Sequence, residues 1–202
     1  MKLKSLLIFI LCMFPILCFS QQDSNFVVRK TLSTNPGGIF LAPTLSAIYP
    51  LGPFGENSKV AAQYGVRLEY ASQNIYPFVV GALIEFTKHQ GKDEFMTANI
   101  LNVFETKTTA IGGSIDIILS KFIKTNFTIP FITLEAKYIN VTRTMSPEKT
   151  IPGIELSQSE LAYGGGAGFT LYIFDIYAKY SRSSSFSTFS VNTRFHFPLI
   201  KF

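Results

Sequence analysis

Residues 62–70 read Ala-Gln-Tyr-Gly-Val-Arg-Leu-Glu-Tyr, and their side chains alternate between two kinds. One set is apolar or aromatic: Ala62, Tyr64, Val66, Leu68 and Tyr70. The other set is polar or tiny: Gln63, Gly65, Arg67 and Glu69. Because successive side chains of a β-strand point to opposite faces, this period of two predicts a strand with one apolar face and one polar face.

The same alternation recurs along most of the chain. It predicts further strands over about 39–49, 78–87, 104–119, 127–143, 160–171, 176–180 and 189–197. The segments between them are predicted as loops or turns: 51–59, 73–76, 89–103, 120–126, 144–156, 173–175 and 181–185, of which 51–59 holds Gly, Pro, Asn and Ser. We therefore expect an all-β protein with eight strands.

Four features indicate that these strands cross a membrane. Many exceed the five or six residues usual in globular proteins and approach the roughly 9 to 11 of a transmembrane strand. Long and short connections alternate, as the outer loops and periplasmic turns of outer-membrane barrels do. Charged residues make up 15% of the chain, against about 25% in soluble domains. Aromatic residues near the strand ends suit two interfacial girdles: Tyr49, Tyr64, Tyr70, Phe78, Phe86, Tyr138, Tyr163, Tyr172 and Phe197.

The first twenty residues have the pattern of a secretory signal peptide. Lys2 and Lys4 precede an apolar run over 6–19, and Ser20 precedes a polar exit. We expect a signal peptide over 1–20, a periplasmic arm over 21–36 and an eight-stranded antiparallel transmembrane β-barrel over 37–202, with both termini in the periplasm. An uncleaved anchor and lipidation at Cys18 are the alternatives.

Composition excludes several classes of function. The two cysteines, Cys12 and Cys18, both lie in the predicted signal, so the mature chain would have no disulfide, cysteine metal site or cysteine nucleophile. Removing Lys2 and Lys4 from the net charge of +5 leaves 5 − 2 = +3, without a basic stripe that would suit nucleic acid.

The alternating segment 189–197 and the terminal Phe202 carry a family resemblance. Over 37–202 the chain resembles the small outer-membrane β-barrel proteins of the OmpA/OmpW-like kind, in the style seen in Bacteroidota. The resemblance implies outer-membrane lipid as the surroundings, and the terminal phenylalanine resembles the signal that barrel-assembly machinery reads. An outer-membrane protein complex is a further partner to test. Such families share a fold more than an activity.

If the apolar faces meet lipid, the charged register faces the lumen. It holds Arg67, Glu69, Glu85, Asp116, Glu135, Lys137, Glu160, Lys179, Arg194 and His196. Side chains fill an eight-stranded barrel, and buried charges must pair. We therefore predict a plugged lumen with a salt-bridged network, while a gated ion or proton path stays open as an alternative. The glycines at 164, 165, 166 and 168 suit either close strand approach or a ligand in the lumen.

The two histidines argue against an enzyme. A lipid hydrolase needs a histidine near the outer leaflet beside a serine, whereas His196 is predicted near the periplasmic end and His89 in an outer loop beside Lys88 and Asp93. Two distant histidines do not make a metal site either. We expect no catalytic residue, metal or cofactor.

The function predicted is therefore a non-catalytic structural or interaction component of the envelope. One alternative is a narrow channel or carrier for small or hydrophobic molecules. The other is a soluble, secreted lipid-binding barrel, which would place the apolar residues inside and Arg67, Lys137 and Arg194 outside.

Overall fold

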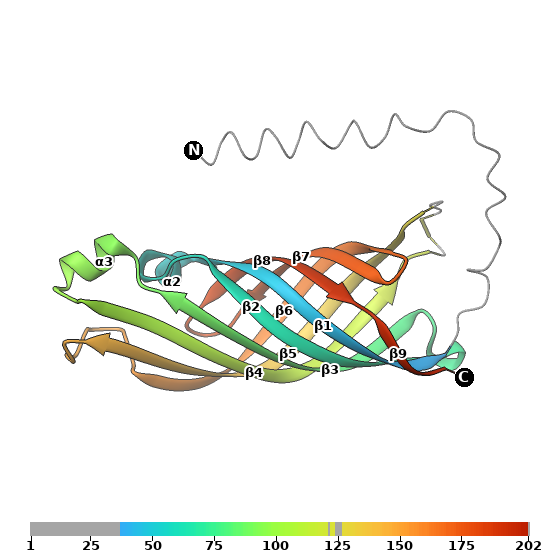
Figure 1. The fold of residues 1–202 in the computed structure, drawn as a ribbon, viewed down its shortest axis with the longest axis horizontal. Coiled ribbons are helices and arrows are strands. Elements are labelled where there is room, and N and C mark those ends of the chain that lie inside the picture. Colours follow the sequence, from blue (N-terminus) through green and yellow to red (C-terminus); the bar gives the residue numbers. More distant parts are fainter. Residues whose placement is uncertain (1–36, 121, 124–126, 202) are drawn as a thin grey trace, which may run out of the picture. The chain divides into compact units, whose positions relative to one another are not determined.

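A single curved sheet makes up most of the described chain (Figure 1). The computed structural model describes residues 37–201 apart from 121 and 124–126. The predicted signal peptide, the predicted arm over 21–36 and Phe202 thus lie outside the described residues. The strands are β1 (Gly38–Leu51), β2 (Ala61–Ala71), β3 (Phe78–Gln90), β4 (Val103–Ile118), β5 (Ile129–Ser146), β6 (Ser157–Leu171), β7 (Phe174–Arg182), β8 (Ser187–Phe195) and β9 (Phe197–Lys201).

Strand β1 closes the sheet, because it pairs with β2 on one side and with β8 and β9 on the other. All other neighbours follow sequence order, and every pair is antiparallel. β8 and β9 pair with successive parts of β1, so together they occupy the position of the eighth strand of the barrel. The prediction of a closed, eight-stranded antiparallel barrel is confirmed.

The eighth strand, formed by β8 and β9, is not the continuous strand that the alternation over 189–197 predicted. It breaks at His196, and the register with β1 shifts between Ile39 and Phe40. Pro198, which has no backbone N–H to donate, follows directly. A bulge of this kind bends the strand locally. It lies at Leu199, whereas the register is continuous across His196, since Arg194 pairs with Thr44 and Phe197 with Leu41.

The two ends of the barrel differ. At one, which we call the loop end, β1 leads into helix α2 (Gly52–Asn57) and β3 into helix α3 (Asp93–Ala98), two short helices within segments predicted as loops. At the other, the turn end, lie the 3-10 turn η1 (Gln73–Ile75), the two-residue turn 172–173 and the outermost residues of β1 and β9. Strands β3 and β5 run to Gln90 and Ser146, further than predicted, because the ladder with β4 continues beyond the barrel wall.

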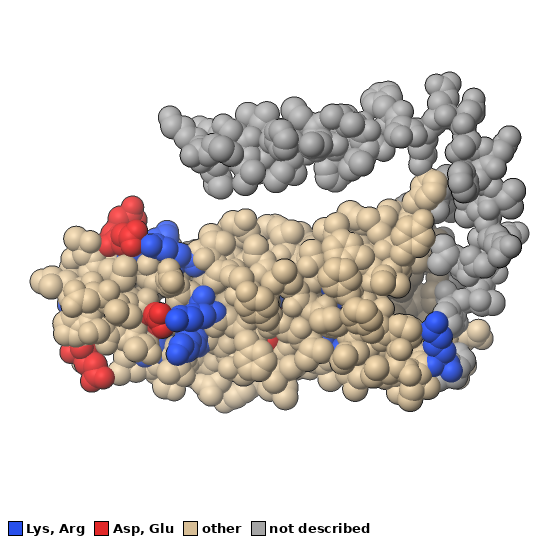
Figure 2. Space-filling view, viewed as in Figure 1, with Lys and Arg blue, Asp and Glu red and all other residues tan. Residues whose placement is uncertain are grey.

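The barrel exterior is apolar. Large side chains of the predicted apolar register are exposed there, for example Leu45, Tyr64, Ile111 and Leu134 at 49–62%. All nine predicted girdle aromatics are also among the exposed residues. Within the described ranges, the exposed charged side chains of the strands lie near the ends: Lys88, Lys107 and Arg182 at the loop end and Lys201 at the turn end. Figure 2 shows the largely uncharged surface between the two ends on one face.

The interior is the reverse, because nine charged side chains are buried in it. Soluble proteins almost never bury such groups in number while exposing a broad apolar band, whereas transmembrane barrels do both. The fold is therefore that of a transmembrane β-barrel. The soluble lipid-binding alternative expected the opposite faces and is wrong about them. Neither α2 nor α3, nor any other described helix, has the length and apolar character to cross a bilayer.

Candidate functional site: a charged plug in the lumen

Arg194 on β8 is the centre of what we call the arginine cluster, which comprises Arg194, Glu69, Asp116, Asp175 and His196. Its Nε donates to Asp175 Oδ2 at 2.7 Å, and one terminal nitrogen donates to Glu69 Oε1 at 2.7 Å. The other terminal nitrogen lies 2.7 Å from Asp116 Oδ2. One guanidinium thereby contacts carboxylates from three other strands. Arginine suits this role because its planar guanidinium carries five N–H donors.

A second group, the lysine cluster, lies nearer the loop end. It comprises Lys137, Lys179, Glu85 and Glu135. Lys137 Nζ lies 2.5 Å from Glu85 Oε2, and Lys179 Nζ lies 2.6 Å from Glu135 Oε2. Each lysine also lies within 3.7 Å of the other carboxylate. Two cations and two carboxylates thus alternate around one small volume, an arrangement that offsets the cost of burying each charge.

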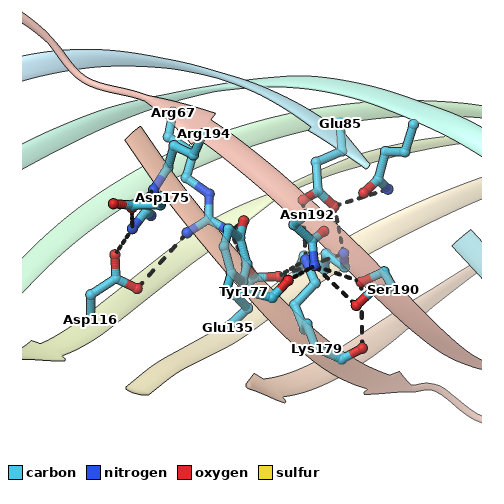
Figure 3. A network of polar contacts seen from close by, with 12 residues as sticks. Arg67, Glu85, Asp116, Glu135, Asp175, Tyr177, Lys179, Ser190, Asn192 and Arg194 are labelled. Atoms are coloured by element: carbon cyan, nitrogen blue, oxygen red, sulfur yellow. Dashed lines mark hydrogen bonds and ion pairs between the residues drawn. The ribbon is translucent and has the colours of Figure 1, made fainter. Parts of the chain in front are cut away.

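Arg67 on β2 connects the two clusters (Figure 3). It is ion-paired with Glu135 of the lysine cluster and lies 4.0 Å from Asp116 of the arginine cluster. The hydroxyl of Tyr177 accepts a hydrogen bond from Arg67 at 3.1 Å. The Tyr177 ring also lies 5.7 Å from the Arg67 guanidinium and 5.4 Å from that of Arg194, within range of cation–π attraction. The charges therefore form one network across the lumen.

Strand periodicity puts these residues together. Arg67 and Glu69 are two apart on β2, as are Glu135 and Lys137 on β5, so each pair shares the inner face. Small residues beside them leave the room that the long side chains need. A Cβ added at Gly81 would press on Glu69 Cγ and Ser114 Oγ. Gly166 and Gly168 of β6 serve close strand approach, since a Cβ at either position would collide with the backbone of β7.

Eight of the ten side chains predicted for the lumen lie in the buried network: Arg67, Glu69, Glu85, Asp116, Glu135, Lys137, Lys179 and Arg194. His196 borders it with 21% of its side chain exposed. Glu160 does not join it. That carboxylate lies at the loop end of β6, where it accepts hydrogen bonds from the Ser184 hydroxyl and the Ser185 backbone N–H.

Sequence reasoning missed Asp175, Tyr177, Ser190 and Asn192. Asp175 was assigned to a turn over 173–175, but β7 begins at Phe174 and turns its carboxylate fully inward. The signal was present, because Asp175, Tyr177 and Lys179 are spaced two apart. Asn192 donates to the carbonyl oxygen of Tyr177 at 3.2 Å and to the Ser190 hydroxyl at 3.0 Å. Tyr177, Ser190 and Asn192 are thus neutral polar residues that hydrogen-bond with one another beside the charged network.

The loop end of the lumen is capped by an aromatic plug. Phe54 of α2 is buried with its ring centre 4.9 Å from that of Phe186 and 5.0 Å from that of His89. His89 is thus not in a loop, as predicted, but on the inner face of β3, and its Nδ1 lies 2.9 Å from the Lys59 carbonyl oxygen. A cavity of about 50 Å³ lies below Phe54 and reaches the lysine cluster. Phe54 therefore covers the lysine cluster.

The turn end is open as a vestibule of about 360 Å³. Its walls are largely apolar, with contributions from Phe40, Phe78, Ile118 and Phe131. The arginine cluster forms its floor. The network thus lies between the vestibule and the small cavity at the loop end. Among the described residues, no group of three or more His, Asp, Glu or Cys side chains is arranged to hold a metal ion.

No protein-family model and no curated protein sequence matches this chain. Solved structures match in fold. Neisserial surface protein A has a TM-score of 0.52 at 11% identity, over 81% of this chain and 100% of its own. The N-terminal β-barrel domain of Pseudomonas aeruginosa OprF has a TM-score of 0.43 at 12% identity, over 80% and 99%. The attachment invasion locus protein Ail of Yersinia pestis has a TM-score of 0.41 at 16% identity, over 80% and 98%. The first likeness shows the small-barrel fold, and the other two are too distant to add to the argument.

Proposed function

We propose that this chain is a non-catalytic, non-conducting barrel of the outer membrane that acts as a structural or interaction component of the envelope. One observation carries the proposal: the lumen is filled by a salt-bridged network across its whole width. An ion in transit would have to break several buried pairs, each of which leaves an uncompensated charge when opened. The largely uncharged surface between the two barrel ends supports a lipid environment, with barrel-assembly machinery as the expected route into it.

The positions of the histidines support a role without catalysis. His89 is held between an aromatic ring and a backbone carbonyl, and both ring nitrogens of His196 face carboxylates. A hydrolytic triad instead needs a histidine that takes a proton from a nucleophile at a surface where substrate binds. The loop end offers the surface for an interaction, since α2, α3 and the β5–β6 connection all lie there.

Two measurements test the proposal. Fractionated cells should hold the protein in the outer membrane as a band that migrates faster unheated than boiled. Purified protein in planar bilayers should give no current steps, and proteoliposomes containing it should not swell in isotonic sugar. Regular conductance steps, abolished when Arg194 or Lys179 is replaced, would show that the lumen conducts and would overturn the proposal.

A second candidate function rests on the vestibule. Its walls expose mainly apolar surface, which suits a small uncharged hydrophobic molecule. Toluene is a suitable probe for methyl NMR in nanodiscs. Binding predicts saturable shifts for Ile118 and Ile129, which line the vestibule, while Ile111 and Ile115 on the exterior respond only to toluene dissolved in lipid. Equal, unsaturable shifts at all four methyl groups would exclude a site in the vestibule.

A further inference from the structure

The buried network has an unequal number of charges. Among the described residues, four Lys and Arg side chains are buried, Arg67, Lys137, Lys179 and Arg194, against five buried carboxylates, Glu69, Glu85, Asp116, Glu135 and Asp175. An uncompensated buried carboxylate is strongly unfavourable. The network therefore needs one more positive charge close to its acidic side.

His196 is placed to supply that charge. Its Nδ1 lies 2.9 Å from Glu69 Oε2, and its Nε2 lies 2.8 Å from Asp175 Oδ2. Ionised carboxylates accept hydrogen bonds and do not donate them, so beside an ionised Glu69 and an ionised Asp175 each ring nitrogen needs its own proton to make these contacts. Only the imidazolium form carries both protons. The contacts of His196 and the charge count thus point to the same protonation state.

Charged groups from several strands surround His196 and influence the protonation state of its ring. Glu69 faces it from β2, Asp175 from β7 and Arg194 from β8, while the Phe40 ring of β1 meets it edge-on with ring centres 6.4 Å apart. Asp116 of β4 lies behind Arg194, and Lys201 of β9 lines the same vestibule. His196 is also the most accessible ionisable member of the arginine cluster, at 21% against 5% or less for the others.

We infer that His196 is a proton-binding site that acts as a latch: as an imidazolium it supplies the fifth cation of the plug and ties the β8–β9 junction to β2 and β7. Loss of its proton to water in the vestibule leaves a neutral ring with a single N–H. That ring satisfies only one of its two carboxylates, and the floor then carries one uncompensated negative charge. Stability from the latch is therefore present while the ring is protonated and is lost as rising pH removes the proton.

Histidine ¹⁵N NMR on the whole barrel in nanodiscs tests the protonation state directly. The chain has only two histidines, so His89 is an internal comparison. At pH 7 His196 should show two protonated ring nitrogens. His89, whose Nδ1 faces a carbonyl oxygen, should show one protonated and one bare nitrogen. A neutral ring at His196 at pH 7 would overturn the inference, whatever any variant does.

Variants then test whether the charge is what matters. His196→Gln should lower the midpoint of thermal unfolding on cold gels by about 5 °C at pH 7 and remove the loss of stability between neutral and alkaline pH. Glu69→Gln in the same chain removes the surplus carboxylate and should restore at least half of that loss. His89→Gln should keep the wild-type pH dependence. If His196→Gln keeps the wild-type pH profile, or if the double variant is no more stable than the single one, there is no latch of this kind.

Discussion

The arginine cluster and the lysine cluster both combine cations with carboxylates in the same lumen, yet they differ in charge balance and in access to water. The lysine cluster pairs two cations with two carboxylates and lies under Phe54. The arginine cluster sets one guanidinium among three carboxylates and opens onto the vestibule. Within one lumen, therefore, the lysine cluster is balanced in charge and shielded from water, whereas the charge balance of the arginine cluster depends on the pH of the water in the vestibule.

The largest expected effect comes from Arg194→Met. It leaves Glu69, Asp116 and Asp175 without their shared cation, and removing one partner from a buried ion network costs about 3–5 kcal/mol. Reversible urea unfolding in lipid vesicles measures the loss, with Arg182→Met as the matched control because that side chain is exposed on β7. Equal effects of the two variants would show that the arginine cluster does not hold the barrel together.

Lys179→Met should cost less, about 2 kcal/mol, although the side chain is as deeply buried as Arg194. The remaining Lys137 still lies near both carboxylates of the lysine cluster. Among the residues that the structure describes, by contrast, His196 is the only other cation that contacts Asp175 and Glu69 together. The same unfolding assay ranks the two variants. A loss for Lys179→Met greater than that for Arg194→Met would reverse the proposed difference between the clusters.

Phe54→Ala tests whether Phe54 shields the lysine cluster from water. It removes the cap of the lysine cluster without touching a charge, so we expect a loss of about 1–3 kcal/mol and no conductance. Hydrogen exchange should quicken at the backbone amides of Thr87 and His89, near the cap, and stay unchanged at the amide of Asp175 on the turn-end side. Faster exchange at Asp175 as well would mean that the two layers do not respond separately.

Glu160→Gln should have the smallest effect, within about 0.5 kcal/mol. Its carboxylate is bonded to Ser184 and Ser185 at the loop end and takes no part in either cluster. Unfolding of this variant serves as the baseline for the other three. A loss comparable to that of Lys179→Met would place Glu160 in the network after all.

Alternation within strands was readable from the sequence, and the register between strands was not. The period of two placed Arg67, Glu69 and Arg194 on one face correctly, because a strand leaves no other choice. Which carboxylate meets which cation depends on the stagger of eight strands around a closed barrel, which no single strand encodes. Asp175 was missed because a tight turn and a strand start look alike over three residues, and Phe54 because its helix lies inside a segment rich in turn residues.

The apolar faces of this barrel meet lipid while the charged faces fill its lumen. The chain contains no tryptophan, so single tryptophans report their own surroundings. The direct measurement is quenching by lipids brominated at different acyl depths, on Leu134→Trp from the middle of β5 and on Leu156→Trp from the loop end. We expect strong quenching of the first tryptophan by deeply placed bromines and little quenching of the second at any depth. Equal and weak quenching of both would mean that the exterior of this barrel does not lie in a membrane.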